Sequence, residues 1–172
     1  MSTTTRTRTS RAAAFACALG VAATVFAAAP AGAATTRNPC KLLKPAQIQA
    51  VLEQSATNGQ PGLSTAVSKS CKFDLTAEQG KPGGGLHLTL MTTGGDIAFN
   101  VNSKRPGSEM VPDLGKAYYS SLAPGDGEVH ILKGKTLLTV QLDYPAVGGP
   151  AIDASLLKDE TIQLGKLAKK RF

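Results

Sequence analysis

The first 33 residues limit most strongly what this chain can fold into, because they have the pattern of a segment that is removed. They contain three arginines and no acidic side chain, and residues 12–29 are all uncharged. A basic start, an apolar core and a small-residue site such as Ala31-Gly32-Ala33 are typical of a secretory signal peptide. We predict cleavage after Ala33, with cleavage after Ala34 as the alternative.

Cleavage would leave one exported domain, residues 34–172, which is long enough to enclose one hydrophobic core. The alternative is an uncut N-terminal membrane anchor at the cell surface, since the uncharged stretch approaches the length of a bilayer span. Much of that stretch is Ala, which inserts weakly, and Cys17 lies inside it rather than at its end, where a lipid anchor requires a cysteine. We therefore expect a secreted protein without a stable membrane span.

Removal of Cys17 with the signal peptide leaves two cysteines, Cys40 and Cys71. An extracellular compartment permits disulfides, so we predict a Cys40–Cys71 bridge. In the chain-entropy model, closing a loop of this length stabilises the fold by about 3 to 4 kcal/mol. A metal site or a catalytic thiol is the alternative, but the sequence has no C-x-x-C motif and no Cys/His cluster. We expect no metal and no other cofactor.

The hydrophobic pattern after Cys40 predicts a single α+β domain. Helical spacing indicates a helix from Pro45 to Gln54 and a closing helix after Asp153 or Ser155. Alternating apolar residues predict strands at residues 71–75, 86–91, 117–121, 128–132 and 136–143. An antiparallel sheet covered on one face by the N-terminal and C-terminal helices would bury these apolar stripes.

Three segments between these elements are less regular. Residues 54–68 are rich in Gly, Pro, Ser, Thr and Asn, which predicts a surface loop, and residues 79–85 are expected to be a hairpin tip. Residues 96–104 fit either an alternating strand or a short helix capped by Asp96, and we favour the helix.

Two histidines, His87 and His130, are the candidate general bases of a catalytic site. Each lies on the polar side of its strand, so the two rings could share a face as a pH-sensitive or metal-binding pair. We favour isolated, half-exposed histidines, because the sequence has neither a G-x-S-x-G nor an H-E-x-x-H motif. Asp126 and Glu128 lie beside a Pro-Gly turn and are expected only to form that turn.

The densest basic cluster consists of Lys166, Lys169, Lys170 and Arg171. It could contact an anionic wall polymer or a membrane, but cations in the last turn of a helix also complement the helix dipole, and we favour that explanation. The three arginines of the signal peptide account for part of the net charge of +7, so the mature chain carries +4. This is too little for a nucleic-acid footprint unless it is concentrated on one face.

Three stretches together resemble a known family: Asn38-Pro39-Cys40-Lys41-Leu42-Leu43, Cys71-Lys72-Phe73, and residues 113–119. Their order is similar to that of an actinobacterial family of short exported proteins and lipoproteins with a domain of unknown function. The resemblance implies an α+β extracytoplasmic domain that is sometimes sensor-like or attached to the cell surface, without an established catalytic site. Phe73 stands where the family often has Trp, and the lipoprotein cysteine motif of many members is missing.

We therefore predict a non-catalytic binding or sensor-like module of the actinobacterial cell envelope or extracellular space. Its partner would be an envelope polymer, a peptide or a protein rather than a nucleic acid, and we expect a monomer. The alternative is a small secreted hydrolase or hydrolase inhibitor. A hydrolase would place His87 or His130 in a pocket beside an acid or a hydroxyl. An inhibitor would instead present a rigid exposed loop, for which residues 54–70 are the candidate.

Overall fold

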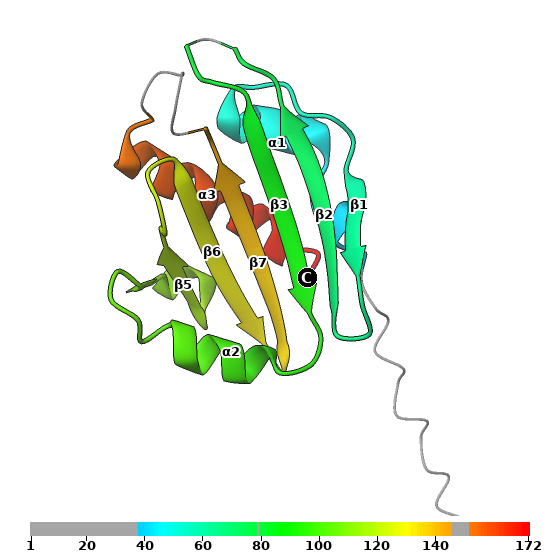
Figure 1. Cartoon of the computed structure of the whole chain (residues 1–172), viewed down its shortest axis with the longest axis vertical. Coiled ribbons are helices and arrows are strands. Elements are labelled where there is room, and N and C mark those ends of the chain that lie inside the picture. The colour runs from blue at the N-terminus through cyan, green and yellow to red at the C-terminus, as the bar shows by residue number, and fades with distance from the viewer. Residues whose placement is uncertain (1–37, 79, 146–151) are drawn as a thin grey trace, which may run out of the picture. The chain divides into compact units, whose positions relative to one another are not determined.

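A computed structural model describes residues 38–78, 80–145 and 152–172 of the chain. These residues form a seven-stranded antiparallel sheet with the strand order β1-β2-β3-β7-β6-β5-β4, together with helices (Figure 1). The predicted α+β class is confirmed. The predicted signal peptide and its cleavage site lie outside the described residues. Within the described ranges, no helix has the length and apolarity needed to cross a membrane.

In chain order, the elements are η1 (Pro39–Lys41), α1 (Pro45–Leu52), β1 (Gln60–Ser64), β2 (Ser68–Leu75), β3 (Gly84–Met91), α2 (Gly95–Asn102), β4 (Glu109–Met110), η2 (Pro112–Leu114), β5 (Ala117–Ser120), β6 (Asp126–Lys133), β7 (Thr136–Asp143) and α3 (Ala154–Lys169).

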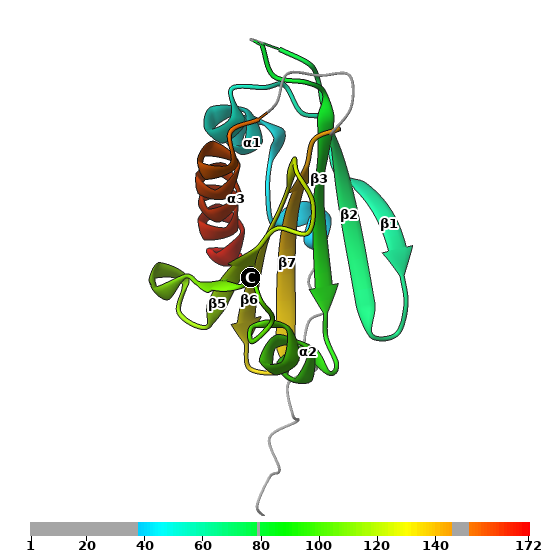
Figure 2. The same ribbon diagram turned by 60° about the vertical axis from the view of Figure 1, so that its left-hand side comes forward.

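One face of the sheet carries the main hydrophobic core. Alternate residues of the central strands, such as Phe73, Leu88 and Val140, are fully buried on this face. Figure 2 shows α1 and α3 on this side of the sheet, and Leu157 and Leu164 of α3 join the same core. Because successive side chains of a strand point to opposite faces, the remaining side chains of these strands lie on the other side of the sheet.

Among the residues that the structure describes, the opposite face is covered by a helix only at one end, where α2 lies across the sheet (Figure 1). Phe99 of α2 packs there against Tyr118 and Leu137 in a second, smaller cluster. Residues 96–104 thus contain the favoured helix, although its position on this face was not predictable from its sequence. We call the uncovered remainder the open face; its polar strand residues are Ser70, Lys72, Asp74, His87, Thr89, Ser120, Asp126, Glu128, His130, Thr139, Gln141 and Asp143.

The prediction of a plain surface loop over residues 54–68 is wrong, because Gln60–Ser64 form the edge strand β1. All five residues of β1 are exposed, so no alternation marks the strand in the sequence. Pro61 has no N–H, and the pairing with β2 is irregular between Pro61 and Ser64. Such features are common in edge strands, where they discourage pairing with other chains.

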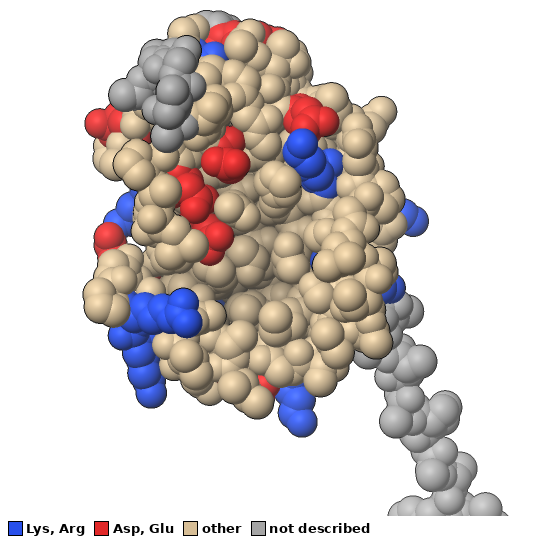
Figure 3. Space-filling view, viewed as in Figure 1, with Lys and Arg blue, Asp and Glu red and all other residues tan. Residues whose placement is uncertain are grey.

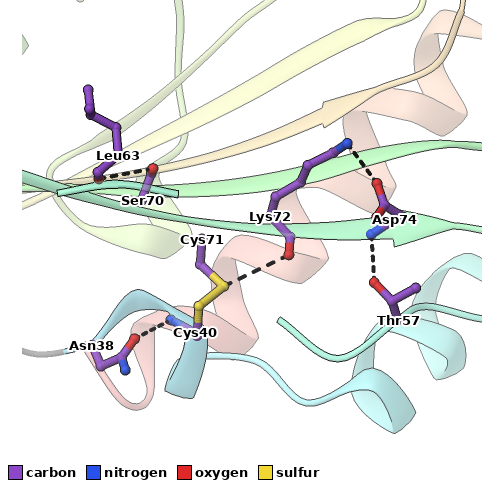
Figure 4. The surroundings of a disulfide bond; sticks show 8 residues. All are labelled: Asn38, Cys40, Thr57, Leu63, Ser70, Cys71, Lys72 and Asp74. Carbon is purple, nitrogen blue, oxygen red and sulfur yellow. Dashed lines mark hydrogen bonds and ion pairs between the residues drawn. A yellow bond between two sulfur atoms is a disulfide. The ribbon is translucent and has the colours of Figure 1, made fainter. Parts of the chain in front are cut away.

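The predicted Cys40–Cys71 disulfide is confirmed, with an S–S distance of 2.06 Å. It ties η1 to β2, and the side chain of Asn38 accepts a hydrogen bond of 2.9 Å from the backbone N–H of Cys40 (Figure 4). A Cβ atom at Gly59 would lie only 2.8 Å from the sulfur of Cys71. A larger side chain at position 59 would collide with the bridge, whereas glycine allows the backbone to pass close to it.

The sheets of the two halves of the chain join between β3 and β7, along a line that we call the seam. The first half runs from η1 to β3 and the second from α2 to α3, and their strands pair from Gly85–Asp143 to Met91–Leu137. Lys81 crosses the seam to place its Nζ 2.5 Å from Oε1 of Glu160 on α3. The same Nζ donates to the backbone oxygen of Leu52 at 2.8 Å.

A buried hydrogen-bond network lies next to this ion pair. Gln54 is fully buried, and its Nε2 donates to the carbonyl oxygens of Thr76 and Pro82, each at 3.0 Å. Its Oε1 accepts a 2.6 Å hydrogen bond from the hydroxyl of Tyr144. Burial, with the negative charge of Glu160 as a smaller cause, raises the pKa of Tyr144, so this hydroxyl stays neutral and remains a donor.

Candidate functional site

The register of the sheet arranges the open face in rows. One row runs from Lys72 through His87 and Gln141 to Glu128, and the next runs from Thr89 through Thr139 to His130. Because neighbouring strands lie about 4.8 Å apart, side chains in the same row or in adjacent rows can contact one another. Figure 3 shows that this face is hollowed near its centre.

His130 is the centre of a hydrogen-bonded cluster built from β5, β6 and β7. Its Nε2 lies 2.9 Å from Oε2 of Glu128 and 3.3 Å from Oγ of Ser120, and its Nδ1 lies 3.0 Å from Oγ1 of Thr139. The imidazole also stacks on the ring of Tyr118, with 4.4 Å between centroids. The prediction of an isolated, half-exposed histidine is therefore wrong for His130, which is buried and fully partnered.

The His130 cluster contains a carboxylate, an imidazole and two hydroxyls, which are groups used in hydrolysis. In the described structure, however, no free backbone N–H lies beside Thr139 to stabilise an oxyanion. Glu128 and Ser120 face the same ring nitrogen, so the serine cannot be the nucleophile of an acid–imidazole–serine relay. Glu128, His130 and Thr139 do form such a line. However, Thr139 lies on β7, which pairs with β3 on one side and with β6 on the other. The ladders occupy the backbone N–H groups that could stabilise an oxyanion there.

A group of carboxylates lies next to this cluster. Asp126 begins β6 and is paired in register with Asp143, and Glu128 follows on the same face. The prediction that Asp126 and Glu128 only form a turn is therefore wrong: Asp126 begins β6, and Glu128, which starts the predicted strand 128–132, also lies on the open face. Their alternation with His130, at positions 126, 128 and 130, was the sequence signal for this placement. In Figure 3 acidic atoms gather over β6 and β7.

Among the described residues, Asp126 and Asp143 of this group have no Lys or Arg partner, whereas Glu128 is hydrogen-bonded to His130. Burial raises the pKa of Asp126, and the negative charges of Glu128 and Asp143 raise it further. The side chain of Gln141 donates to Oδ1 of Asp126 at 3.2 Å, and this hydrogen bond and the nearby His130 oppose the rise in pKa only in part. Across the ranges that the structure describes, no Lys or Arg lies within 4.0 Å of either Asp126 or Asp143.

His87 also lies on the open face but does not meet His130. The strand β7 separates the two, and the register places them in different rows. His87 instead lines a shallow pocket of about 310 Å³ with Lys72 and Asp143. Among the residues described by the structure, no cluster of three or more His, Cys, Asp or Glu side chains could hold a metal ion.

The basic residues at the end of the chain divide into different environments. Lys169 donates to the backbone oxygen of Leu114 at 3.0 Å, and Lys170 is exposed at the end of α3. Arg171 turns toward the N-terminal half, where its Nη1 lies 3.4 Å from the oxygen of Leu42. None of these three side chains belongs to the open face.

No protein-family model, curated protein or solved structure matches the chain. The chemistry of the open face is therefore inferred from its geometry, and the resemblance to an exported actinobacterial family stays a prediction.

Proposed function

We propose that this protein is a non-catalytic binding module of the extracellular space or cell envelope, and that the open face is its binding surface. The observation that carries this proposal is the recessed position of the polar side chains. The side chains of His130 and Glu128 are only 11% and 16% exposed, although their strand positions face away from the main core. The predicted signal peptide and the disulfide support an extracytoplasmic location.

The open face is well suited to binding because its side chains are already held in place. They project from strands rather than from loops, and cross-strand contacts such as His130 to Thr139 fix their orientation. A site built in this way loses little conformational entropy when a ligand binds. We infer that the His130 cluster forms a rigid floor on which a partner is recognised.

The charges of the open face favour a basic partner. Its carboxylates are Asp74, Asp126, Glu128 and Asp143, whereas its only lysine, Lys72, is paired with Asp74 at 2.7 Å. An unbalanced set of carboxylates in a partly desolvated hollow attracts ammonium and guanidinium groups more strongly than it would in bulk water. We propose that the partner is a peptide or protein segment rich in Lys or Arg.

A hydrolase is the second candidate, favoured by the Glu128–His130–Thr139 line. We propose that this line has a structural role, because no free backbone donors surround Thr139. Hydrolysis of p-nitrophenyl acetate that is lost in Thr139→Val but retained in Ser120→Ala would establish the hydrolase instead. Under our proposal, neither variant changes the slow background rate.

Titration with a lysine octapeptide tests the binding proposal, with backbone amide NMR shifts as the readout. We expect saturable shifts at strands β3, β6 and β7. Asp126→Asn and Asp143→Asn should each weaken binding roughly two- to fivefold, the range of one partly exposed charge pair. The matched control is Asp159→Asn, which removes the same charge from an exposed position on α3. Equal weakening by the control, or shifts spread over the whole surface, would refute the open face as the site.

A further inference from the structure

A second candidate site, separate from the open face, is a pocket of about 600 Å³ beside the disulfide. The buried side chains of Leu43 and Phe73 lie beneath it, and the exposed side chains of Lys41, Lys44 and Arg171 line it. We call it the basic pocket. Its volume lies within the usual range of small-molecule sites. Phe73 faces the main core, so the basic pocket and the open face lie on opposite sides of β2.

The three cations of the basic pocket have no counter-ion within 4.0 Å in the part of the chain that the structure describes. None of the residues that line the pocket is acidic. In the described ranges, Lys41, Lys44 and Arg171 form no ion pair with a carboxylate. Three like charges around one space repel each other, and a bound anion would relieve this repulsion.

The helix α1 adds positive potential to the same space. Lys44 and Pro45, at its N-terminus, line the pocket, and the first turn of α1 contains no acidic residue. The N–H of Lys44 already donates to Oε1 of Gln47 and Pro45 has no N–H, so it is the partial positive charge of the helix N-terminus that favours an anion there. It thus acts in the same direction as the three side chains.

The cations are carried by anchored segments of the chain. Lys41 follows Cys40, which the disulfide fixes to β2. Arg171 precedes Phe172, whose side chain is buried and whose backbone oxygen accepts a 3.0 Å hydrogen bond from Lys133. The backbone on both sides of the pocket is therefore held in place before a ligand arrives, which reduces the entropy lost on binding.

We propose that the basic pocket binds the phosphate group of a phosphate-bearing ligand. Three cations and a helix N-terminus match a phosphomonoester, which carries close to two negative charges at neutral pH, better than a single carboxylate. Arg171 supplies the planar guanidinium that can donate two parallel hydrogen bonds to such a group.

Isothermal titration with glycerol 3-phosphate, and with glycerate as the carboxylate analogue of similar size, tests this proposal. We expect saturable binding of glycerol 3-phosphate that weakens with added salt and is at least several times tighter than binding of glycerate. Arg171→Gln should lower the affinity roughly tenfold, as expected for a lost charge-assisted hydrogen bond. Lys44→Gln should act in the same direction.

Lys170→Gln is the matched control, because Lys170 is exposed, adjacent to Arg171 and not part of the pocket lining. It should change the affinity less than twofold. An equal loss in this control, equal binding of glycerate, or no saturable binding would overturn the proposal. Unchanged circular dichroism in each variant ensures that folded proteins are compared.

Vesicles distinguish the two sources of such a phosphate. Binding of phosphatidic acid vesicles, whose headgroup is a phosphomonoester, to wild type but not to Arg171→Gln would include a lipid headgroup among the ligands. Binding of glycerol 3-phosphate without vesicle binding would restrict them to soluble phosphates. Vesicle binding alone, unaffected by Arg171→Gln, would overturn the pocket as the phosphate site.

Discussion

Replacement of Lys81 by Met should destabilise the fold far more than removal of a surface charge. Lys81 and Glu160 form an ion pair whose side chains are only 16% and 6% exposed. The second carboxylate oxygen of Glu160 is buried without a hydrogen-bond partner among the residues that the structure describes. Without Lys81, the carboxylate of Glu160 would therefore be left buried and unpaired.

The expected cost follows from this burial. Breaking a buried ion pair by removing one partner costs about 3 to 5 kcal/mol, whereas replacing both partners by apolar residues is close to neutral. We expect Lys81→Met to fall near the lower end, since Lys81 keeps some contact with solvent. Glu160→Leu should cost about 2 kcal/mol, because the ammonium of Lys81 retains its bond to the backbone oxygen of Leu52. The double variant should lie within about 1 kcal/mol of wild type.

Urea unfolding of the four proteins at pH 7, followed by circular dichroism, gives the double-mutant cycle. The coupling between Lys81 and Glu160 should reach about 3 kcal/mol or more. The control is Lys166→Met, which breaks an exposed pair with Asp113 and should cost less than about 0.5 kcal/mol. The reasoning is refuted if the losses in unfolding free energy of the two single variants sum to that of the double variant, because the ion pair would then not stabilise the contact between the β2–β3 connection and α3.

Two further perturbations test the disulfide and the carboxylate group. Replacing Cys40 and Cys71 together by Ala should lower the free energy of unfolding by about 3.7 kcal/mol, the chain-entropy value for 31 residues of separation; a urea midpoint equal to that of the oxidised wild type would contradict this. Asp126→Asn should raise stability by up to about 0.5 kcal/mol at pH 7, and the gain should vanish near pH 3. The sign follows because the folded-state pKa of Asp126 is raised, so its stabilising proton is bound at low pH and lost as pH rises through that pKa. Thermal unfolding across this pH range measures the gain, and a gain that grows toward low pH would reverse the assignment.

Sequence alternation predicted the sheet wherever a strand has one buried and one polar side. Leu86, Leu88 and Leu90 of β3 are all buried as expected, and the observed β7 matches the predicted range 136–143. The closing helix was predictable from its cap, because Asp153 accepts hydrogen bonds from the N–H groups of Ser155 and Leu156. Cysteine parity was sufficient to predict the disulfide.

Features that depend on register or on long-range packing could not be predicted in this way. Glu128 and His130 are two residues apart on β6, but Ser120 and Thr139 join them from neighbouring strands whose register the sequence does not specify. Arg171 reaches Leu42 only because α3 packs beside α1. The edge strand β1 was missed because every one of its side chains is exposed, so the hydrophobic effect leaves no pattern there.

The two halves of the chain pair across the seam as two different subunits would pair in a heterodimer. Each half is continuous in sequence, and the connection between them passes through a short turn that contains the exposed Thr93. A break at this turn would leave two fragments that retain the strand ladder between β3 and β7, so their association would depend on concentration as it does for two subunits. The basic pocket takes Lys41 and Lys44 from one half and Arg171 from the other. A phosphate bound there would contact both halves, so the two fragments would bind each other more tightly when the ligand is present.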